Sequence, residues 1–200
     1  MLTLRHYLLV LALLLMVKLF CPYKLNLVVG SSMEPNLRDG QLCLVDTGAY
    51  RRSEPRRGDV VLANLDSVTC VKRVYGLPGD RFWLLRSAEG DTSGAFLLGA
   101  RVPQGVRNMV TQNKRHFRLE RVVVPDDCLY LVGDNLPASM DSRELGWGYQ
   151  EDLIGRVLAW RSAGSYPRWT PPPPPLAEPT TTQVLAPPTS PSSLRALAAL

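Results

Sequence analysis

The feature that most constrains this fold is an apolar run close to the amino terminus. Residues Tyr7 to Cys21 read YLLVLALLLMVKLFC, fifteen residues with a single charge at Lys18. As a helix that rises about 1.5 Å per residue the run reaches about 22 Å, whereas a membrane hydrocarbon core is roughly 30 Å thick. A spanning helix therefore needs flanking residues, and Lys18 must extend its charge toward the headgroups. We predict a transmembrane anchor over residues 7–25, preceded by a flank of residues 1–6.

A cleavable signal peptide is the competing interpretation, because Arg5 followed by a short apolar run also fits that template. No convincing small-x-small cleavage site follows before Ser31. That absence favours a retained anchor. The charge rule leaves the orientation open, since Arg5 lies on one side of the run and Lys18 and Lys24 lie toward the other.

The net charge of +5 does not indicate a nucleic-acid partner, because the basic residues are scattered and form no recognised binding motif. We predict no nucleic-acid binding and assign the surplus charge to the anionic headgroups of a lipid bilayer. The four cysteines have no C-x-x-C spacing, and only two histidines are present to join them, so we predict no metal site and no cofactor. The cysteines are typical of small apolar core residues. A disulfide is the alternative if the domain lies outside the cytosol.

Short stretches typical of β-strands follow the anchor and are separated by turn-forming residues. They are 41–45, 59–63, 68–74, 81–85, 117–124, 128–132 and 153–160. No long amphipathic helix is expected between residues 40 and 160, so the strands must pack on one another or close into a barrel-like form. Residues 87–114 are rich in glycine and polar side chains and predict a hairpin excursion or a long loop. The fold class is mostly β, with a single domain over residues 26–162.

Residues 163–200 change in character, with a run of five prolines and few periodic apolar positions. Such a segment favours polyproline II and cannot bury enough apolar surface to offset its ordering entropy. We predict a proline-rich disordered tail, with binding to an aromatic-groove domain as the alternative.

The segment Gly30 to Pro35 reads GSSMEP and directly follows the anchor. Small residues and a proline favour an irregular conformation that leaves a serine side chain exposed. Taken alone, however, two serines beside a glycine indicate a loop far more often than a nucleophile.

A lysine within the stretch 68–74 is more informative, because alternation places Lys72 on one face of a strand with Val68, Cys70 and Val74. Arg73 belongs to the opposite face, where we expect the solvated charge. Burial disfavours the ammonium form, so Lys72 could act as a general base near neutral pH. The alternative is a lysine that extends into solvent at a sheet edge.

A dense polar run, GDN at 133–135 and SMDSR at 139–143, follows the apolar stretch 128–132. Such a run is usually a turn. Asp141 and Arg143 nevertheless have the chemistry for a salt bridge, and Ser139 could donate a hydrogen bond that orients a neutral amine.

Three segments in this order, GSSMEPNL, VKRVYGLPGD and GDNLPASMDSRELG, together resemble the serine, lysine and Gly-Asp-Asn boxes of type I signal peptidases. The resemblance extends from the anchor to about Trp160. It implies a compact signal-peptidase-like β domain after one N-terminal transmembrane helix, with Ser32 as the nucleophile and Lys72 as the base. The supporting residues fall in the third box: Asp134, Ser139, Asp141 and Arg143.

The reaction expected of such a protein is peptide cleavage without histidine or metal. Neutral Lys72 takes the proton of Ser32, the serine oxygen attacks the scissile carbonyl, and water releases the resulting acyl group. The Ser32 backbone N–H is the natural oxyanion donor. In some family members a serine two residues before the nucleophile donates as well, but that position is Gly30 here. Ser31, a backbone amide or a water must then substitute.

The resemblance implies precursor proteins with N-terminal signal or targeting peptides as substrates, with small residues at positions −1 and −3. We hypothesise that Met33 and Pro35 help to form the shallow pockets for these residues. The resemblance also implies a single-pass membrane protein with its catalytic domain on the trans side. The runs DSRELG and DLIGR favour a bacterial plasma membrane, and the mitochondrial inner membrane is the alternative.

Two other functions compete with this prediction. A non-catalytic, membrane-anchored partner subunit of such a peptidase would be expected to lose Ser32 or Lys72 first, and both are present. Self-cleavage, as in repressor-type Ser–Lys proteins, fits poorly with an anchor. A related subunit remains a candidate partner.

Overall fold

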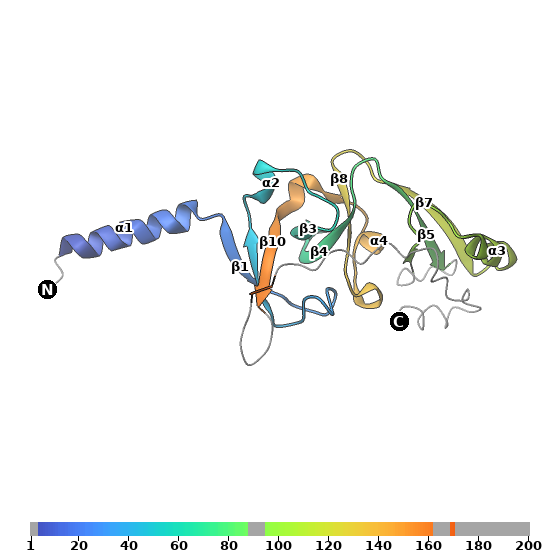
Figure 1. Ribbon diagram of the computed structural model, residues 1–200, viewed down its shortest axis with the longest axis horizontal. Coiled ribbons are helices and arrows are strands. Elements are labelled where there is room, and N and C mark those ends of the chain that lie inside the picture. The colour runs from blue at the N-terminus through green and yellow to red at the C-terminus, as the bar shows by residue number, and fades with distance from the viewer. Residues whose placement is uncertain (1–3, 88–94, 162–168, 171–200) are drawn as a thin grey trace.

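The computed structural model describes residues 4–87, 95–161 and 169–170, and one helix projects from a mostly β body (Figure 1). The helix, α1, spans Leu4–Phe20, and the strand β1 follows at Tyr23–Leu27. Residues 23–25, the end of the predicted anchor, are therefore the beginning of β1. Within the described part of the chain, no helix is both long enough and apolar enough to cross a membrane.

The body is built on an antiparallel sheet with the strand order β1-β2-β10-β3-β4-β8-β9, and β11 pairs with β10. The strands after β1 are β2 (Leu42–Asp46), β3 (Val60–Leu65), β4 (Val68–Gly76), β8 (Cys128–Val132), β9 (Gly148–Tyr149), β10 (Leu153–Arg161) and β11 (Trp169–Thr170). Short helical turns connect them: α2 (Ala49–Arg52), η2 (Leu136–Ala138), α4 (Ser142–Leu145) and η3 (Gln150–Asp152). The mostly β prediction is confirmed.

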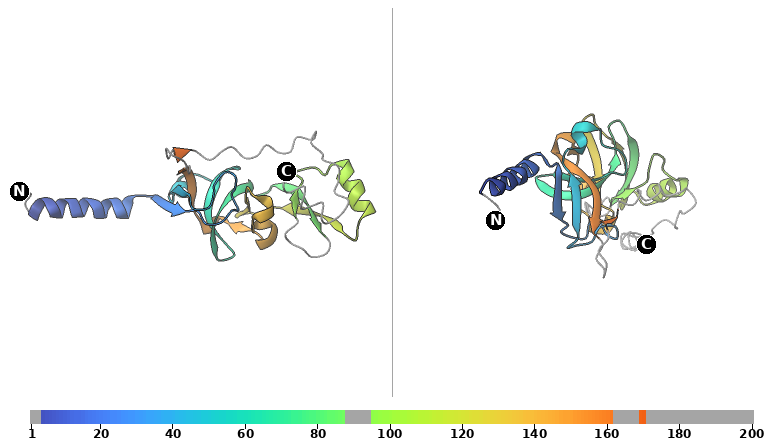
Figure 2. Two further views of the ribbon diagram at one scale, coloured as in Figure 1. Left: turned by 90° about the horizontal axis from the view of Figure 1, so that it is seen from below. Right: turned by 60° about the vertical axis from the view of Figure 1, so that its left-hand side comes forward.

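A second sheet forms an extension that we call the distal arm. The arm consists of β5 (Arg81–Ser87), β6 (Phe96–Leu97), α3 (Gln104–Gln112) and β7 (Phe117–Val123), with the strand order β6-β5-β7. It lies at the end of the molecule opposite α1 (Figures 1 and 2). Backbone hydrogen bonds from Gly79 N to the Val124 carbonyl and from Val124 N to the Asp80 carbonyl join the two segments that connect the arm to the body, at 2.9 and 3.0 Å.

The arm also corrects the sequence analysis. All seven predicted strands are present, but the stretch interpreted as a hairpin or loop also contains α3. Val106, Met109 and Val110 are spaced at helical intervals and pack against Leu85 and Phe117. Isolated glycine and polar residues around them concealed this short period.

Some predictions fall outside what the structure describes. Of the predicted tail, residues 163–200, only Trp169–Thr170 are described, and they form β11. All four cysteines are free thiols. Cys43 and Cys128 are buried as expected, Cys70 is half-buried and Cys21 is exposed.

Candidate active site

Ser32 lies in the loop between β1 and β2, and two buried apolar side chains fix this loop. Met33 and Leu37 are 1% and 0% exposed and pack in the core beside β2, β3 and β10. Backbone hydrogen bonds from Glu34 N to the Ser31 carbonyl and from Leu37 N to the Met33 carbonyl close the turn, at 3.1 and 2.9 Å. Ser32 remains half-buried, so its hydroxyl stays accessible while its backbone is held.

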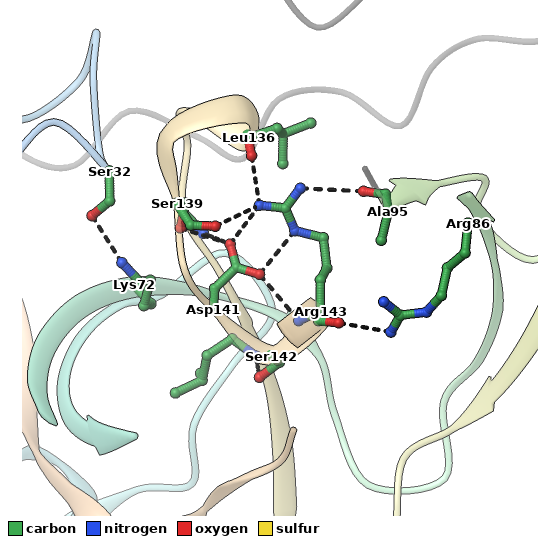
Figure 3. Close-up of polar contacts among 11 residues, drawn as sticks. Ser32, Lys72, Arg86, Ala95, Leu136, Ser139, Asp141, Ser142 and Arg143 are labelled. Atoms are coloured by element: carbon green, nitrogen blue, oxygen red, sulfur yellow. Dashed lines mark hydrogen bonds and ion pairs between the residues drawn. The ribbon is translucent and has the colours of Figure 1, made fainter. Parts of the chain in front are cut away.

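Lys72 comes from the middle of β4 and reaches this hydroxyl. Its Nζ lies 2.8 Å from Ser32 Oγ, which joins two residues that are 40 positions apart in the sequence (Figure 3). The lysine is only 3% exposed. The fold therefore brings together the two residues that the sequence analysis placed in a catalytic dyad.

Burial lowers the pKa of Lys72 from its ordinary value, because the ammonium form loses its hydration inside the protein. Cys70 and Asp141 act in the opposite direction and favour the charged form, Arg143 lowers the pKa again, and Asp134 raises it. The net direction is downward, toward the neutral amine that a general base requires.

Asp141 and Arg143 form a salt bridge next to the lysine, as predicted. Arg143 Nε lies 2.8 Å from Asp141 Oδ1, and Arg143 Nη2 lies 2.9 Å from Asp141 Oδ2. Asp141 is fully buried and also accepts hydrogen bonds from Gly133 N at 2.9 Å and from Ser139 Oγ at 2.7 Å. The carboxylate is thus satisfied on both oxygens and held rigidly.

Ser139 lies in this network, but its hydroxyl donates to Asp141. Its backbone carbonyl accepts from Arg143 Nη2 at 3.1 Å. In the described structure no hydrogen bond joins Ser139 to Lys72, so the predicted direct orientation of the amine is not among the observed contacts.

The Gly-Asp-Asn segment at 133–135 clamps the serine loop onto the body. Asn135 N donates to the Ser32 carbonyl and Asn135 Nδ2 donates to the Ser31 carbonyl, both at 3.0 Å. Asn36 Nδ2 donates to Asp134 Oδ2 at 2.8 Å. The sequence analysis did not assign roles to Asn36 and Asn135, although both lie within its quoted boxes.

Gly133 is required where this clamp and the serine loop meet. A Cβ at this position would lie 2.2 Å from Ser139 Oγ and 2.5 Å from the Ser32 carbonyl oxygen. Both approaches are far shorter than a real Cβ contact, and the second is to backbone. Glycine therefore lets the two segments approach each other at the site.

Arg73 contradicts the expectation of a solvated charge. It is 6% exposed, and its guanidinium makes two bonds to Asp134, Nε to Oδ1 and Nη2 to Oδ2, each 2.7 Å long. It also donates to the Gly58 carbonyl at 2.9 Å. The strand is covered on both faces, so simple alternation misassigned the solvent face.

The two residues that were predicted to contact the substrate differ in their exposure to solvent. Pro35 is exposed beside Ser32, whereas the Met33 side chain is 1% exposed and belongs to the core. The structure therefore does not place the Met33 side chain on a surface that a substrate would touch.

The oxyanion donors are partly visible. Among the described residues, none accepts a hydrogen bond from the Ser32 N–H. Gly30 N donates to Asp39 Oδ1 at 2.8 Å, so this amide is already used. No group of three or more His, Cys, Asp or Glu side chains that could hold a metal ion occurs within the described residues.

The family described as "Signal peptidase, peptidase S26" matches residues 2–160. A signal peptidase I of Bacillus amyloliquefaciens is 34% identical over 153 residues, which cover 73% of this chain and 78% of that protein. Signal peptidase I S of Bacillus subtilis is 33% identical over 157 residues, with coverages of 73% and 79%. A solved signal peptidase I of Enterococcus faecalis is 21% identical with a TM-score of 0.32, covering 52% of this chain and 97% of that one.

Proposed function

This chain belongs to the signal peptidase family, peptidase S26, as a serine peptidase of the signal peptidase I type, and we propose that Ser32 and Lys72 are its catalytic dyad. The observation that carries the proposal is the 2.8 Å approach of Lys72 Nζ to Ser32 Oγ across 40 residues of sequence. Burial of the lysine supports it, since a buried amine without a carboxylate in contact loses its proton more readily.

The reaction begins when neutral Lys72 accepts the proton of Ser32 while the serine oxygen attacks the scissile carbonyl. The carbon–nitrogen bond breaks, the protonated lysine gives its proton to the leaving amine, and the acyl group stays on Ser32. Lys72, neutral again, then takes a proton from a water that attacks this ester. The ester bond then breaks, the protonated lysine returns its proton to the serine oxygen, and the acid is released.

Supporting residues act by position in this proposal. Asp141 and Arg143 form a neutralised pair behind the lysine, and Ser139 fixes the Asp141 carboxylate. Asp134 holds the loop through Asn36 and Arg73, which keeps the serine oxygen within reach of the amine.

The developing oxyanion is stabilised by the backbone N–H of Ser32, the donor adjoining the reacting oxygen. Because Gly30 N is bonded to Asp39, the Ser31 hydroxyl or a water supplies the second donor. Ser31 is half-buried in the same turn, and its carbonyl is held by Asn135, which keeps the residue beside the nucleophile.

The substrates are precursor proteins whose N-terminal signal peptides are removed after translocation. The names of the bacterial relatives support this substrate class. Small side chains at positions −1 and −3 are expected to enter shallow pockets next to exposed Pro35. α1 together with flanking residues serves as a single-pass anchor in a bacterial plasma membrane, with the catalytic domain on the trans side.

The test uses the detergent-solubilised full chain with precursors that carry a bacterial or a mitochondrial presequence. The wild type is expected to cleave the bacterial precursor, and Ser32→Ala to cleave neither. Ser67→Ala removes an exposed serine hydroxyl in the turn between β3 and β4 and is the matched control, which should keep wild-type activity. Cleavage by neither the wild type nor Ser67→Ala would instead favour a non-catalytic partner subunit.

A further inference from the structure

The distal arm touches the site at two points, both on Arg143. Arg143 Nη1 donates to the Ala95 carbonyl at 3.2 Å, just before β6. Arg86 of β5 donates from Nη2 to the Arg143 carbonyl at 2.7 Å (Figure 3). One residue next to the dyad is therefore gripped by the arm at both its side chain and its backbone.

Arg86 is itself oriented by the arm. Its Nε forms an ion pair with Glu120 of β7, the strand that pairs with β5. The Arg86 side chain is 15% exposed and that of Glu120 is 43% exposed. This pair lies outside the three sequence boxes that identify the site.

We propose that Arg86 is a positioning residue for the peptidase reaction, which holds Arg143 against Asp141 from the arm while Glu120 orients it. The inference rests on the proposed Ser32–Lys72 chemistry. It assigns the arm a role in catalysis, although the arm supplies no reacting atom.

Local structure gives Arg86 its importance. Arg143 lies in α4, a helix of a single turn, Ser142–Leu145, which has little stability of its own. The guanidinium of Arg143 also holds the Leu136 carbonyl at 2.7 Å, so a shift of its backbone would loosen several bonds together. A donor from a neighbouring sheet fixes the backbone against such a shift.

A displacement of Arg143 would change the electrostatic interactions that set the pKa of Lys72. The groups that act on Lys72 are Cys70 on its own strand, Asp134 after β8, and Asp141 and Arg143 around α4. Arg143 lowers the pKa of Lys72, whereas Asp141 raises it. If Arg143 moves away, the attraction of Asp141 for the ammonium is less balanced, the pKa rises, and less neutral base is present at pH 7.

The experiment measures kcat/KM against pH, from 6 to 10, for the full chain in detergent with a signal-peptide substrate. Arg86→Gln is expected to lose about threefold at pH 7, because a rise in the pKa of Lys72 leaves less neutral base at that pH, and to approach the wild-type rate at high pH. Arg86→Lys keeps a donor and should recover most of the activity. The control Arg118→Gln removes an exposed arginine directly opposite Arg86 in the β5–β7 register.

An unchanged profile for Arg86→Gln overturns the proposal, and so does a loss by the same factor at every pH, which indicates support of the fold only. If Arg86→Gln does not fold, Glu120→Gln takes its place, with a smaller shift in the same direction expected. A wild-type profile for Glu120→Gln then overturns the proposal. Ser32→Ala is run in parallel, because activity in that variant would contradict the dyad itself rather than the role of Arg86.

Discussion

Lys72 and Arg73 are neighbouring basic residues of β4, and both are buried, but their side chains have different polar partners. Arg73 is bonded twice to the carboxylate of Asp134 and once to the Gly58 carbonyl. Lys72 is 3% exposed and meets the hydroxyl of Ser32, and no carboxylate in the described part of the chain forms an ion pair with it. One strand therefore carries a basic residue that is paired with a carboxylate and a basic residue that is hydrogen-bonded to a hydroxyl.

These two environments suit two different roles, structural support for Arg73 and proton transfer for Lys72. A buried guanidinium with a carboxylate stays charged and fixes the parts that it joins. A buried amine that faces a hydroxyl is easier to deprotonate, because burial disfavours its charge more than the nearby carboxylates of Asp134 and Asp141 favour it. Substitutions at these residues and at the segments that hold them test whether the two roles are as distinct as the contacts indicate.

The largest effect is expected when Lys72 or Ser32 is replaced. Lys72→Ala and Ser32→Ala should each lower the cleavage rate by about 10⁴-fold, as for loss of a member of a catalytic triad. Melting temperatures followed by circular dichroism should stay within a few degrees of the wild type. A Lys72→Ala protein within tenfold of wild-type activity would contradict the assignment.

The ion pair between Arg73 and Asp134 should instead contribute to the free energy of unfolding. Asp134→Asn removes the carboxylate that is paired with the buried guanidinium of Arg73 and should lower the free energy of unfolding by about 3 kcal/mol. Urea denaturation measures this loss. Asp126→Asn, at an exposed position, is the control and should change the free energy by less than about 0.5 kcal/mol. Equal stability of the two variants would show that Arg73 does not depend on Asp134.

The distance between the two segments at the dyad can be changed at Gly133. Gly133→Ala places a Cβ 2.5 Å from the Ser32 carbonyl oxygen, so the serine loop must move. We expect kcat to fall by about 100-fold, the effect of a displacement near 1 Å at a reacting group. Gly105→Ala, where an added Cβ meets nothing within 4 Å, should leave kcat unchanged. Wild-type kcat in Gly133→Ala would mean that the loop position is not critical.

The smallest effect is expected in the free energy of unfolding, which is lowered by the burial of Lys72. The pKa of Lys72 is lowered in the folded protein, so between that lowered pKa and 10.5 the unfolded chain binds more protons, and wild-type stability rises with pH through that window. Lys72→Met removes this cost and should raise the free energy of unfolding by about 1 kcal/mol at pH 7. The advantage should shrink toward pH 10. Urea unfolding of both proteins at the two pH values measures it, and a less stable variant at pH 7 would contradict the account.

The contact between Ser32 and Lys72 and most strands could be predicted from the sequence, the strands from local patterns and the contact from the resemblance of three boxes taken together. The apolar and alternating stretches predicted seven strands, and the three boxes identified Ser32 and Lys72. Alternation did not show that Arg73 is buried, since it cannot tell a strand covered on one face from a strand covered on both.

Contacts between distant segments were not predictable in the same way. Asn135 supports the Ser31 and Ser32 carbonyls from more than 100 residues away, and nothing in its neighbours indicates that partner. Arg86 contacts Arg143 only because β5 and β7 form an arm beside α4. Met33 was expected at a substrate pocket because it adjoins the nucleophile, but the turn directs it into the core.

The central claim is that Lys72 acts as a neutral base toward Ser32, and Lys72→Arg tests it most directly. An arginine keeps the positive charge and hydrogen-bonding capacity but is never deprotonated in proteins. The measurement is the rate at which Ser32 is acylated in a single turnover, followed by intact mass between pH 6 and 10. The account predicts no detectable acylation in the folded Lys72→Arg protein at any of these pH values. Acylation within tenfold of the wild type would contradict it.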